Sequence, residues 1–353
     1  METMKILYVS SCGIPTPAPA YSGLEQVCWN TAVGMKKLGH EVSIVASADS
    51  DKKAYDKAGI SLIPTVFSSL TPIPESEMWS LAIGRIRDFN KYDLIHDMSH
   101  SGVAILGEME AQKNATPFPP RIWTIHDDLP FSTHPPVPYP CIISPSLANS
   151  QGISERVPDM VTRVCWHGID TELHKYSEDK GDRLLYVGRI DPIKSADMAI
   201  NIADVTGHGL DIVGPIHIRN KYSEKILSLC DGKNIVYHGE VPHEKKVEFM
   251  QKAKALVTFP RFQEPFGLLS PEAQATGTPV ISDCMGGLPE TIKQGVTGFS
   301  CVTPGDAVQA IERIDSIRPK ECRAWVEKHF TVEEMCGRYR KIYREVLERG
   351  VRW

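Results

Sequence analysis

Short apolar runs alternate with longer amphipathic stretches along most of the chain. In the first half the apolar runs end in polar residues, and they occupy residues 5–11, 40–47, 93–96, 121–127 and 141–146. The stretch between the first two runs carries apolar residues at helical spacing. Strands that alternate with helices in this way cross over into a parallel sheet, and ligands bind beyond the carboxyl ends of its strands.

A second series of the same kind follows the charged, non-periodic stretch 172–183. Its strands are expected at residues 184–189, 210–214, 235–239, 255–260 and 279–283. A chain of 353 residues also exceeds what one hydrophobic core usually serves. We therefore predict two Rossmann-like α/β domains, residues 1–172 and 173–332, joined through 172–183. The amphipathic segment 333–353 is predicted to cross back as a helix onto the first domain.

The net charge and the distribution of cysteines restrict the possible partners and the cellular compartment. The net charge is −5 and neither half has an excess of clustered Lys and Arg, which argues against nucleic acid and allows at most peripheral membrane contact. The nine cysteines are scattered without a CxxC pair, which favours reduced thiols. The first apolar run is too short for a signal peptide or a membrane span. We expect a soluble cytoplasmic protein.

The stretch "FPRFQEPFGLLSPEAQATGTPV" combines several features of an anion site. Ser270 is a natural N-cap and Pro271 fits the first helical position, so a helix is predicted to start here. Gly267 lets a ligand approach the backbone, and the start of a helix offers about half a positive charge to a phosphate. The sequence therefore predicts a phosphate site without a Walker-type lysine.

Charged side chains flank this loop and a second one. Glu264 and Glu272 bracket the predicted helix start, and carboxylates accept hydrogen bonds from sugar hydroxyls well. Arg189 and Lys194 follow a strand and precede a helix, as a diphosphate site would require. Each of these residues also has a simpler interpretation, as a solvated loop charge or, for Glu272, as a complement to the helix dipole.

Metal sites are weaker hypotheses. His96 and His126 each follow an apolar run and are expected at the ligand edge of the first sheet, where an imidazole can bond a sugar hydroxyl. His96 and His100 have helical metal-ligand spacing, and residues 49–51 read Asp-Ser-Asp, but no third ligand accompanies either group. We therefore expect no bound metal and no cofactor.

The chain resembles family 4 of the retaining glycosyltransferases over nearly its full length. The motifs that carry the resemblance are "GLEQVCWNTAVGMKKLGHEV", "WTIHD", "HGID", "YVGRIDPIKSADMAI" and "GTPVISDCMGGLPETIKQGVTGF", together with the two glutamates described above. The resemblance implies the GT-B fold, in which two Rossmann-like domains face each other across a cleft. It also implies a nucleotide-sugar donor.

The resemblance further assigns roles to individual residues. It places the donor diphosphate against Arg189, Lys194 and the backbone amides of Phe266, Gly267, Leu268 and Leu269. It places the donor sugar against Glu264 and His126, the ribose against Glu272, a phosphate against Gly23, and the nucleotide base against the backbone from His238 to Val241. The catalytic residues on this reading are His126, Arg189, Lys194 and Glu264.

Three positions depart from the family pattern. The first loop reads Ser22-Gly23 where two glycines are common, and His167 stands where an asparagine is usual. The usual Lys-Gly pair is Lys194-Ser195, a change expected to be harmless because serine caps a helix as well as glycine does.

The predicted function is metal-independent, retaining transfer of a hexose, with UDP-glucose favoured as donor. The acceptor, of unknown class, is expected on the first domain near residues 63–79 and 127–140. A nucleotide-sugar epimerase and a non-catalytic nucleotide-sugar sensor are the alternatives. A nicotinamide-dependent dehydrogenase is disfavoured, since no G-x-G-x-x-G follows the first strand.

Overall fold

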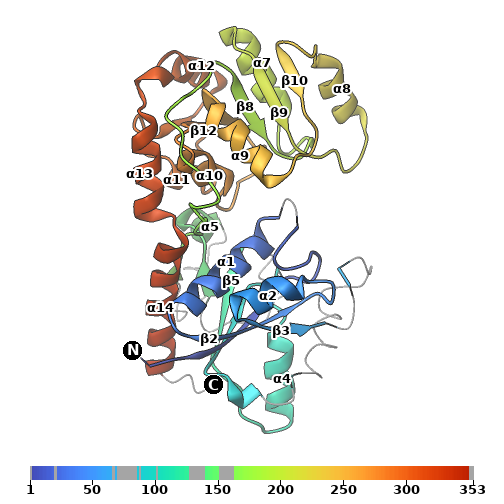
Figure 1. Cartoon of the computed structure of the whole chain (residues 1–353), viewed down its shortest axis with the longest axis vertical. Coiled ribbons are helices and arrows are strands. Elements are labelled where there is room, and N and C mark those ends of the chain that lie inside the picture. The colour runs from blue at the N-terminus through green and yellow to red at the C-terminus, as the bar shows by residue number, and fades with distance from the viewer. Residues whose placement is uncertain are drawn as a thin grey trace. The chain divides into compact units, whose positions relative to one another are not determined.

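A computed structural model describes residues 2–19, 22–65, 68–69, 86, 89–100, 102–126, 140–150 and 163–349. Most of the two segments expected to receive an acceptor, 63–79 and 127–140, lies outside these residues. The chain forms two compact units, Met1–Gly168 with Val332–Trp353, and Ile169–Thr331. Each unit has its own parallel sheet, as the alternation of strands and helices predicts (Figure 1).

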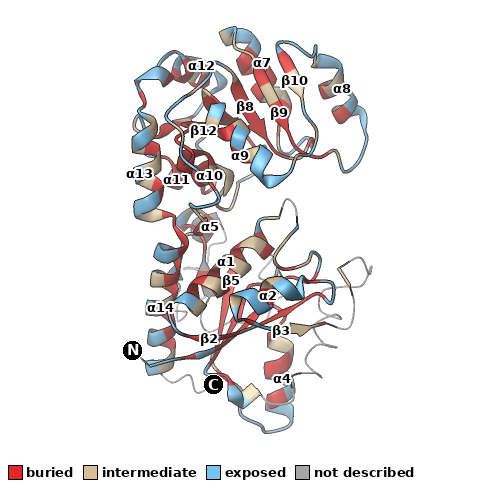
Figure 2. Ribbon diagram, viewed as in Figure 1, coloured by how far each residue is buried: buried red, intermediate tan, exposed pale blue. Residues whose placement is uncertain are grey.

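The first unit holds a seven-stranded sheet of order β3-β2-β1-β4-β5-β6-β7. Its strands are β1 (Lys5–Val9), β2 (Glu41–Ala46), β3 (Ser61–Pro64), β4 (Leu94–Asp97), β5 (Arg121–Ile125), β6 (Pro140–Ile142) and β7 (Arg163–Val164). Its helices are α1 (Leu24–Lys37), α2 (Lys52–Ala58), α4 (Ile105–Lys113), α5 (Pro145–Ser150) and α14 (Val332–Arg349), with a 3-10 turn at Phe89–Lys91. The central strands are buried along almost their whole length, as parallel strands covered on both faces should be (Figure 2).

The second unit holds a six-stranded sheet of order β10-β9-β8-β11-β12-β13. Its strands are β8 (Leu184–Val187), β9 (Leu210–Val213), β10 (Ile235–Tyr237), β11 (Ala255–Thr258), β12 (Val280–Asp283) and β13 (Gly298–Cys301). Its helices are α7 (Ala196–Thr206), α8 (Lys221–Leu229), α9 (His243–Lys252), α10 (Leu269–Ala275), α11 (Leu288–Thr291), α12 (Pro304–Glu312) and α13 (Pro319–His329), with a 3-10 turn at Ile314–Ser316. Within the described ranges, neither unit has a helix long and apolar enough to cross a membrane.

The stretch 172–183 lies on the second unit. Lys180 Nζ donates hydrogen bonds of 2.9 Å to the carbonyls of Gln251 and Thr276. Arg323 Nη1 donates to the carbonyl of His174 at 2.8 Å. The chain passes from one compact unit to the other at residues 168–169 and again at 331–332, outside this stretch.

Helix α14 packs in the first unit, which confirms that the last helix crosses back. Tyr343 Oη lies 2.9 Å from Tyr8 Oη on β1 and 2.6 Å from His96 Nδ1 on β4. His96 Nε2 lies 2.7 Å from Thr124 Oγ1 on β5. The expectation that His96 projects at the ligand edge is therefore wrong, because this residue belongs to β4 itself and is fully buried.

Ser195 differs from the simple cap that the sequence suggests. Helix α7 begins at Ala196 as expected, but Ser195 has φ 62° and ψ 46° and its side chain accepts no capping hydrogen bond. In this left-handed region the Cβ atom is crowded, at a cost of about 1 kcal/mol that glycine avoids. Serine is thus not equivalent to glycine here.

We expect Ser195→Gly to stabilise the protein. Relief of the left-handed strain should raise the free energy of unfolding by about 0.5–1 kcal/mol and the thermal midpoint by about 2 °C. Ser195→Ala is the control, because alanine keeps the Cβ and should give no gain. Differential scanning calorimetry of both variants measures the change, and a lower midpoint for the glycine variant would contradict the argument.

Candidate functional site

The loop after β8 carries two of the predicted cations at the carboxyl end of the second sheet. Tyr186, the third residue of β8, is buried, and its hydroxyl shares one proton between the carbonyl of Arg189 at 3.0 Å and that of Lys194 at 3.2 Å. Two points of the loop are therefore fastened to the strand. The half-buried Arg189 side chain forms no ion pair with any residue that the structure describes.

Lys194 and Glu264 come together from two different strand ends. Lys194 Nζ lies 2.7 Å from Glu264 Oε2, and the two side chains are 20% and 23% exposed. The same ammonium lies 4.5 Å from the centroid of the Phe262 ring, a cation–π distance. The structure thus joins a cation and a carboxylate that the sequence singled out separately.

Arg261 links these two loops by hydrogen bonds, a role that the sequence did not predict. Its Nη2 donates to Asp197 Oδ2 at 2.6 Å, and its Nη1 donates to the carbonyl of Pro192 at 2.9 Å. Its backbone amide donates to the carbonyl of Ile193 at 2.7 Å. The available signal was an arginine directly after the strand motif "ALVTFP", at the same sheet edge as Lys194.

Helix α10 starts earlier than predicted. It begins at Leu269, so the expectations that Ser270 is the N-cap and Pro271 the first helical residue are wrong. Ser270 is buried inside the helix, and its hydroxyl accepts hydrogen bonds from Gln274 Nε2 at 2.8 Å and Thr291 Oγ1 at 2.7 Å. Tertiary partners for the hydroxyl therefore override the capping preference.

Backbone amides at the start of α10 and in the turn before it remain available to a ligand. The amides of Gly267, Leu268 and Leu269 donate to no residue in the described part of the chain. Gly267 has φ +81°, and a Cβ there would lie 2.4 Å from Leu288 Cδ2, so the turn requires glycine. Phe266 is buried, at 2% exposure, and anchors the turn.

The glycine pair after β12 packs on the backbone of Glu264. The Gly287 amide donates to the carbonyl of Glu264 at 2.7 Å, and a Cβ on Gly286 would lie 2.4 Å from that same oxygen. Asp283 lies at the end of β12, where burial and then the charge of Glu264 raise its pKa to about 6. No sequence pattern indicated this second carboxyl group near Glu264.

Glu272 is held from two directions. Lys246 Nζ lies 2.9 Å from Glu272 Oε2, and His174 Nε2 lies 3.8 Å from Glu272 Oε1. Burial alone would raise the pKa of Glu272, but the charge and the hydrogen bond of Lys246, together with the neighbouring His174, outweigh it and lower the pKa. Neither partner was identified from the sequence, because both are distant from Glu272 along the chain.

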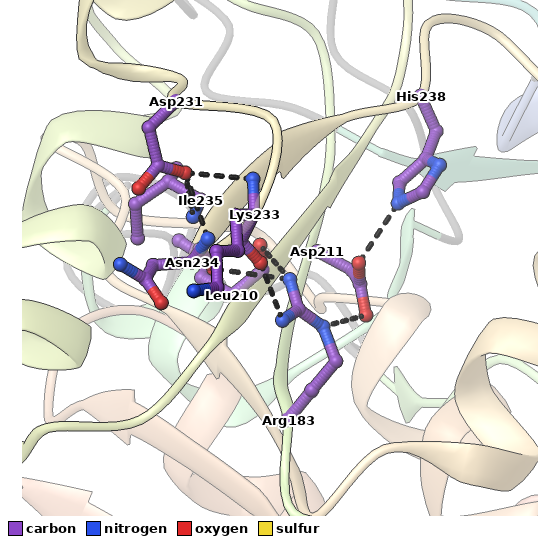
Figure 3. Close-up of polar contacts among 8 residues, drawn as sticks. All are labelled: Arg183, Leu210, Asp211, Asp231, Lys233, Asn234, Ile235 and His238. Carbon is purple, nitrogen blue, oxygen red and sulfur yellow. Dashed lines mark hydrogen bonds and ion pairs between the residues drawn. The ribbon is translucent and has the colours of Figure 1, made fainter.

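The predicted base-binding segment is also tied to the sheet (Figure 3). His238 Nε2 lies 2.8 Å from Asp211 Oδ1 on β9, and Arg183 Nε donates to Asp211 Oδ2 at 2.9 Å. Val241, the end of the segment, is half-buried against the apolar cluster that one face of β9, β8, β11 and β12 forms with α9 and α10. Contacts with the sheet and its apolar cluster therefore hold both ends of the segment, His238 and Val241, in place.

Two predicted residues belong to the first unit. Gly23 is the exposed N-cap of α1, with a right-handed φ of −85°. His126 follows β5 and is 8% exposed, and its Nδ1 lies 3.3 Å from His167 Nε2. Contact of either residue with a donor stays a prediction.

The two aspartates of the Asp-Ser-Asp motif at residues 49–51 have structural roles. Asp49 accepts hydrogen bonds from the Ser68 hydroxyl at 2.9 Å and the Ser69 amide at 3.0 Å. Asp51 caps α2 by accepting from the amide of Lys53 at 2.9 Å. Over the ranges that the structure describes, no three His, Cys, Asp or Glu side chains gather closely enough to hold a metal.

Two parallel-sheet units with this topology have the fold of GT-B glycosyltransferases. Residues 21–173 match the family described as "Glycosyltransferase Family 4", and residues 170–329 match "Glycosyl transferases group 1". The chain belongs to the group 1, family 4 glycosyltransferases.

Individual glycosyltransferases are similar to this chain, some in sequence and others in fold. A D-inositol 3-phosphate glycosyltransferase from Mycobacterium sp. (strain KMS) is 32% identical over 137 residues, or 37% of this chain and 31% of that protein. The chain matches less than half of the length of such curated relatives. AviGT4, a glycosyltransferase involved in avilamycin A biosynthesis, is 21% identical with a TM-score of 0.73, covering 98% of this chain and 99% of that one. HepE from Anabaena, solved with UDP and glucose, is 16% identical with a TM-score of 0.73, covering 97% and 100%.

Proposed function

We propose that the protein is a retaining glycosyltransferase that moves a hexose from a nucleotide diphosphate-sugar to an acceptor hydroxyl without a metal ion. The observation that carries the proposal is the Lys194–Glu264 pair at the carboxyl edge of the second sheet. It supplies a cation for a diphosphate and a carboxylate for sugar hydroxyls within 2.7 Å of each other. Membership of the glycosyltransferase family supports the same reaction class.

The charge that develops on the leaving diphosphate is the main chemical problem. Fixed donors aimed at that charge can stabilise the transition state in place of a metal. In our proposal Arg189, Lys194 and the amides of Gly267, Leu268 and Leu269 are these donors. The fastening of the Arg189–Lys194 loop by Tyr186 and Arg261 supports their preorganisation.

The proposed transfer takes place on one face of the sugar. The bond from the anomeric carbon to the diphosphate oxygen breaks as the acceptor oxygen bonds to that carbon on the same face. A phosphate oxygen of the leaving group takes the acceptor proton. We assign no carboxylate as a covalent nucleophile, and Glu264 holds the hydroxyls of the donor sugar, with His126 from the first unit as a second contact.

UDP-glucose is the donor that we favour. HepE shares the fold and is solved with UDP and glucose and, separately, with UDP-glucose. The remaining donor contacts in the proposal are Gly23, Phe266, the backbone up to Val241, and Glu272, which contacts the ribose. The acceptor is a small molecule, glycan or lipid. We place the reaction in the cytoplasm, because nine scattered cysteines without a CxxC pair suit a reducing compartment.

Calorimetric titration tests the donor class. We expect UDP to bind more tightly than GDP, with a dissociation constant below millimolar, because a diphosphate meets two cations and several free amides. UDP-glucose, UDP-N-acetylglucosamine and GDP-mannose are then compared as substrates in a hydrolysis screen followed by an acceptor screen. Failure of both UDP and GDP to bind below millimolar concentration would contradict the proposal, and binding without turnover of any donor would favour a sensor.

A further inference from the structure

Two positively chargeable groups from different segments converge on the carboxylate of Glu272. Lys246 on α9 approaches Oε2 at 2.9 Å, and His174, which precedes β8, faces Oε1 at 3.8 Å. All three side chains are largely buried, with exposures of 14% for Lys246, 5% for His174 and 16% for Glu272. Each oxygen of the carboxylate therefore has its own neighbour.

The hydrogen bonding of His174 assigns a proton to Nδ1. Nδ1 lies 2.8 Å from the carbonyl oxygen of Asp170, and a carbonyl can only accept, so Nδ1 is a donor. Nε2 is buried, has no hydrogen-bond partner among the described residues, and faces Glu272 Oε1. Nε2 points at the carboxylate from a fixed position, and it can donate toward Oε1 when the ring carries a second proton, as an imidazolium.

A neighbouring ring restricts His174 further. His243, the first residue of α9, packs edge-on against it with 5.1 Å between the ring centroids. Lys246 lies one turn along the same helix and reaches the other carboxylate oxygen. An ionised carboxylate has about four lone-pair positions, so both contacts together leave positions on each oxygen for further hydrogen bonds.

We propose that His174 and Lys246 are positioning residues that orient Glu272 to accept hydrogen bonds from the vicinal hydroxyls of the donor's ribose. This inference rests on the proposed function, in which Glu272 contacts the ribose. The two residues thereby set the preference of the site for ribonucleotides over nucleotides that lack the ribose hydroxyls. Their effect acts through Glu272, and neither residue itself contacts the nucleotide.

Two substitutions at His174 distinguish the contribution of Nδ1 from that of Nε2. In His174→Asn the shorter amide can still donate to the Asp170 carbonyl but cannot reach Glu272, whereas in His174→Gln the amide can reach toward Glu272. Calorimetric titration with UDP and with 2′,3′-dideoxy-UDP gives the preference for the ribose hydroxyls. We expect His174→Asn and Lys246→Met to weaken UDP binding by about tenfold, the scale of one hydrogen bond to a charged group, and to leave dideoxy-UDP binding unchanged.

The controls distinguish this inference from the proposed function. His174→Gln should recover most of the UDP affinity, and Lys245→Met, on the exposed side of α9, should bind both nucleotides like the wild type. Equal weakening of UDP and dideoxy-UDP in His174→Asn and Lys246→Met would overturn the positioning role. Wild-type protein that binds UDP and dideoxy-UDP equally well would overturn it too, while leaving the donor class intact. Wild-type protein that binds neither nucleotide would contradict the proposed function itself.

Discussion

Replacing Lys194 by alanine should lower the rate of sugar transfer by about two to three powers of ten, the loss seen when one preorganised charge donor is removed from a transition state. The negative charge of the diphosphate grows as the sugar departs, and Lys194 is the cation that the structure places beside Glu264 at 2.7 Å. Removal of the ammonium takes away a charge that the remaining donors cannot move to replace, because their loops are fastened to β8 and to Arg261.

Single-turnover kinetics with the best donor from the hydrolysis screen measures this effect apart from product release. Lys245→Ala is the matched control, since this lysine also pairs with a glutamate, at 2.6 Å, but is 53% exposed on α9. Its rate should stay within about twofold of the wild type. The same assay in excess EDTA should give an unchanged rate. Near-normal turnover by Lys194→Ala, or loss of activity on chelation with recovery by Mg²⁺ or Mn²⁺, would show that the leaving group is stabilised in another way.

The sequence predicts these charged groups at the edge of the second sheet because it shows where the strands end. Arg189 and Lys194 follow β8 in the chain and Glu264 follows β11, and β8 and β11 are hydrogen-bonded neighbours. Parallel neighbours bring their carboxyl ends to one edge, so residues far apart in sequence meet there. This much of the site follows from the order of strands and from family resemblance.

Other features of the site depend on tertiary packing and could not be predicted from the sequence. Lys246 and His174 approach Glu272 from segments with no local relation to it, so no spacing could reveal them. Ser270 has the local signature of a cap, but its hydroxyl is satisfied by Gln274 and Thr291 instead. Ser195 has the composition of a cap, whereas its left-handed backbone is set by the turn that precedes α7.

The burial of His96 in the first unit also depends on tertiary packing and could not be predicted from the local sequence. The polar end of an apolar run suggests a residue at the edge of the sheet. Here the strand continues through His96 to Asp97, and α14 returns from the far end of the chain to cover it. The partner that buries this histidine lies 247 residues away, so the local pattern could not distinguish an edge position from a core position.

Acidification should destabilise the first unit through two buried histidines. Burial lowers the pKa of His96 to about 3, with a smaller contribution from His126, and burial lowers the pKa of His167 to about 3 as well. In the unfolded chain both groups have their ordinary pKa near 6.5. Between these values the unfolded chain binds protons that the folded unit does not, so stability is lost as the pH falls below 6.5.

The expected size of this loss follows from linkage. Each pH unit below 6.5 lowers the free energy of unfolding by about 1.4 kcal/mol per histidine, so a fall from pH 7.5 to 5.5 should cost about 3 kcal/mol for the pair. Urea unfolding at both pH values, with hydrogen exchange in β4 as the local probe, measures it. His96→Gln should be less stable than the wild type at pH 7.5, because Tyr343 and Thr124 lose an imidazole partner, but it should show about half of the pH dependence. His217→Gln, at an exposed position, should keep the full dependence. An unchanged free energy of unfolding between pH 7.5 and 5.5 would mean that the folded unit accepts a proton at these sites, in conflict with the buried hydrogen bonds of His96 to α14 and β5.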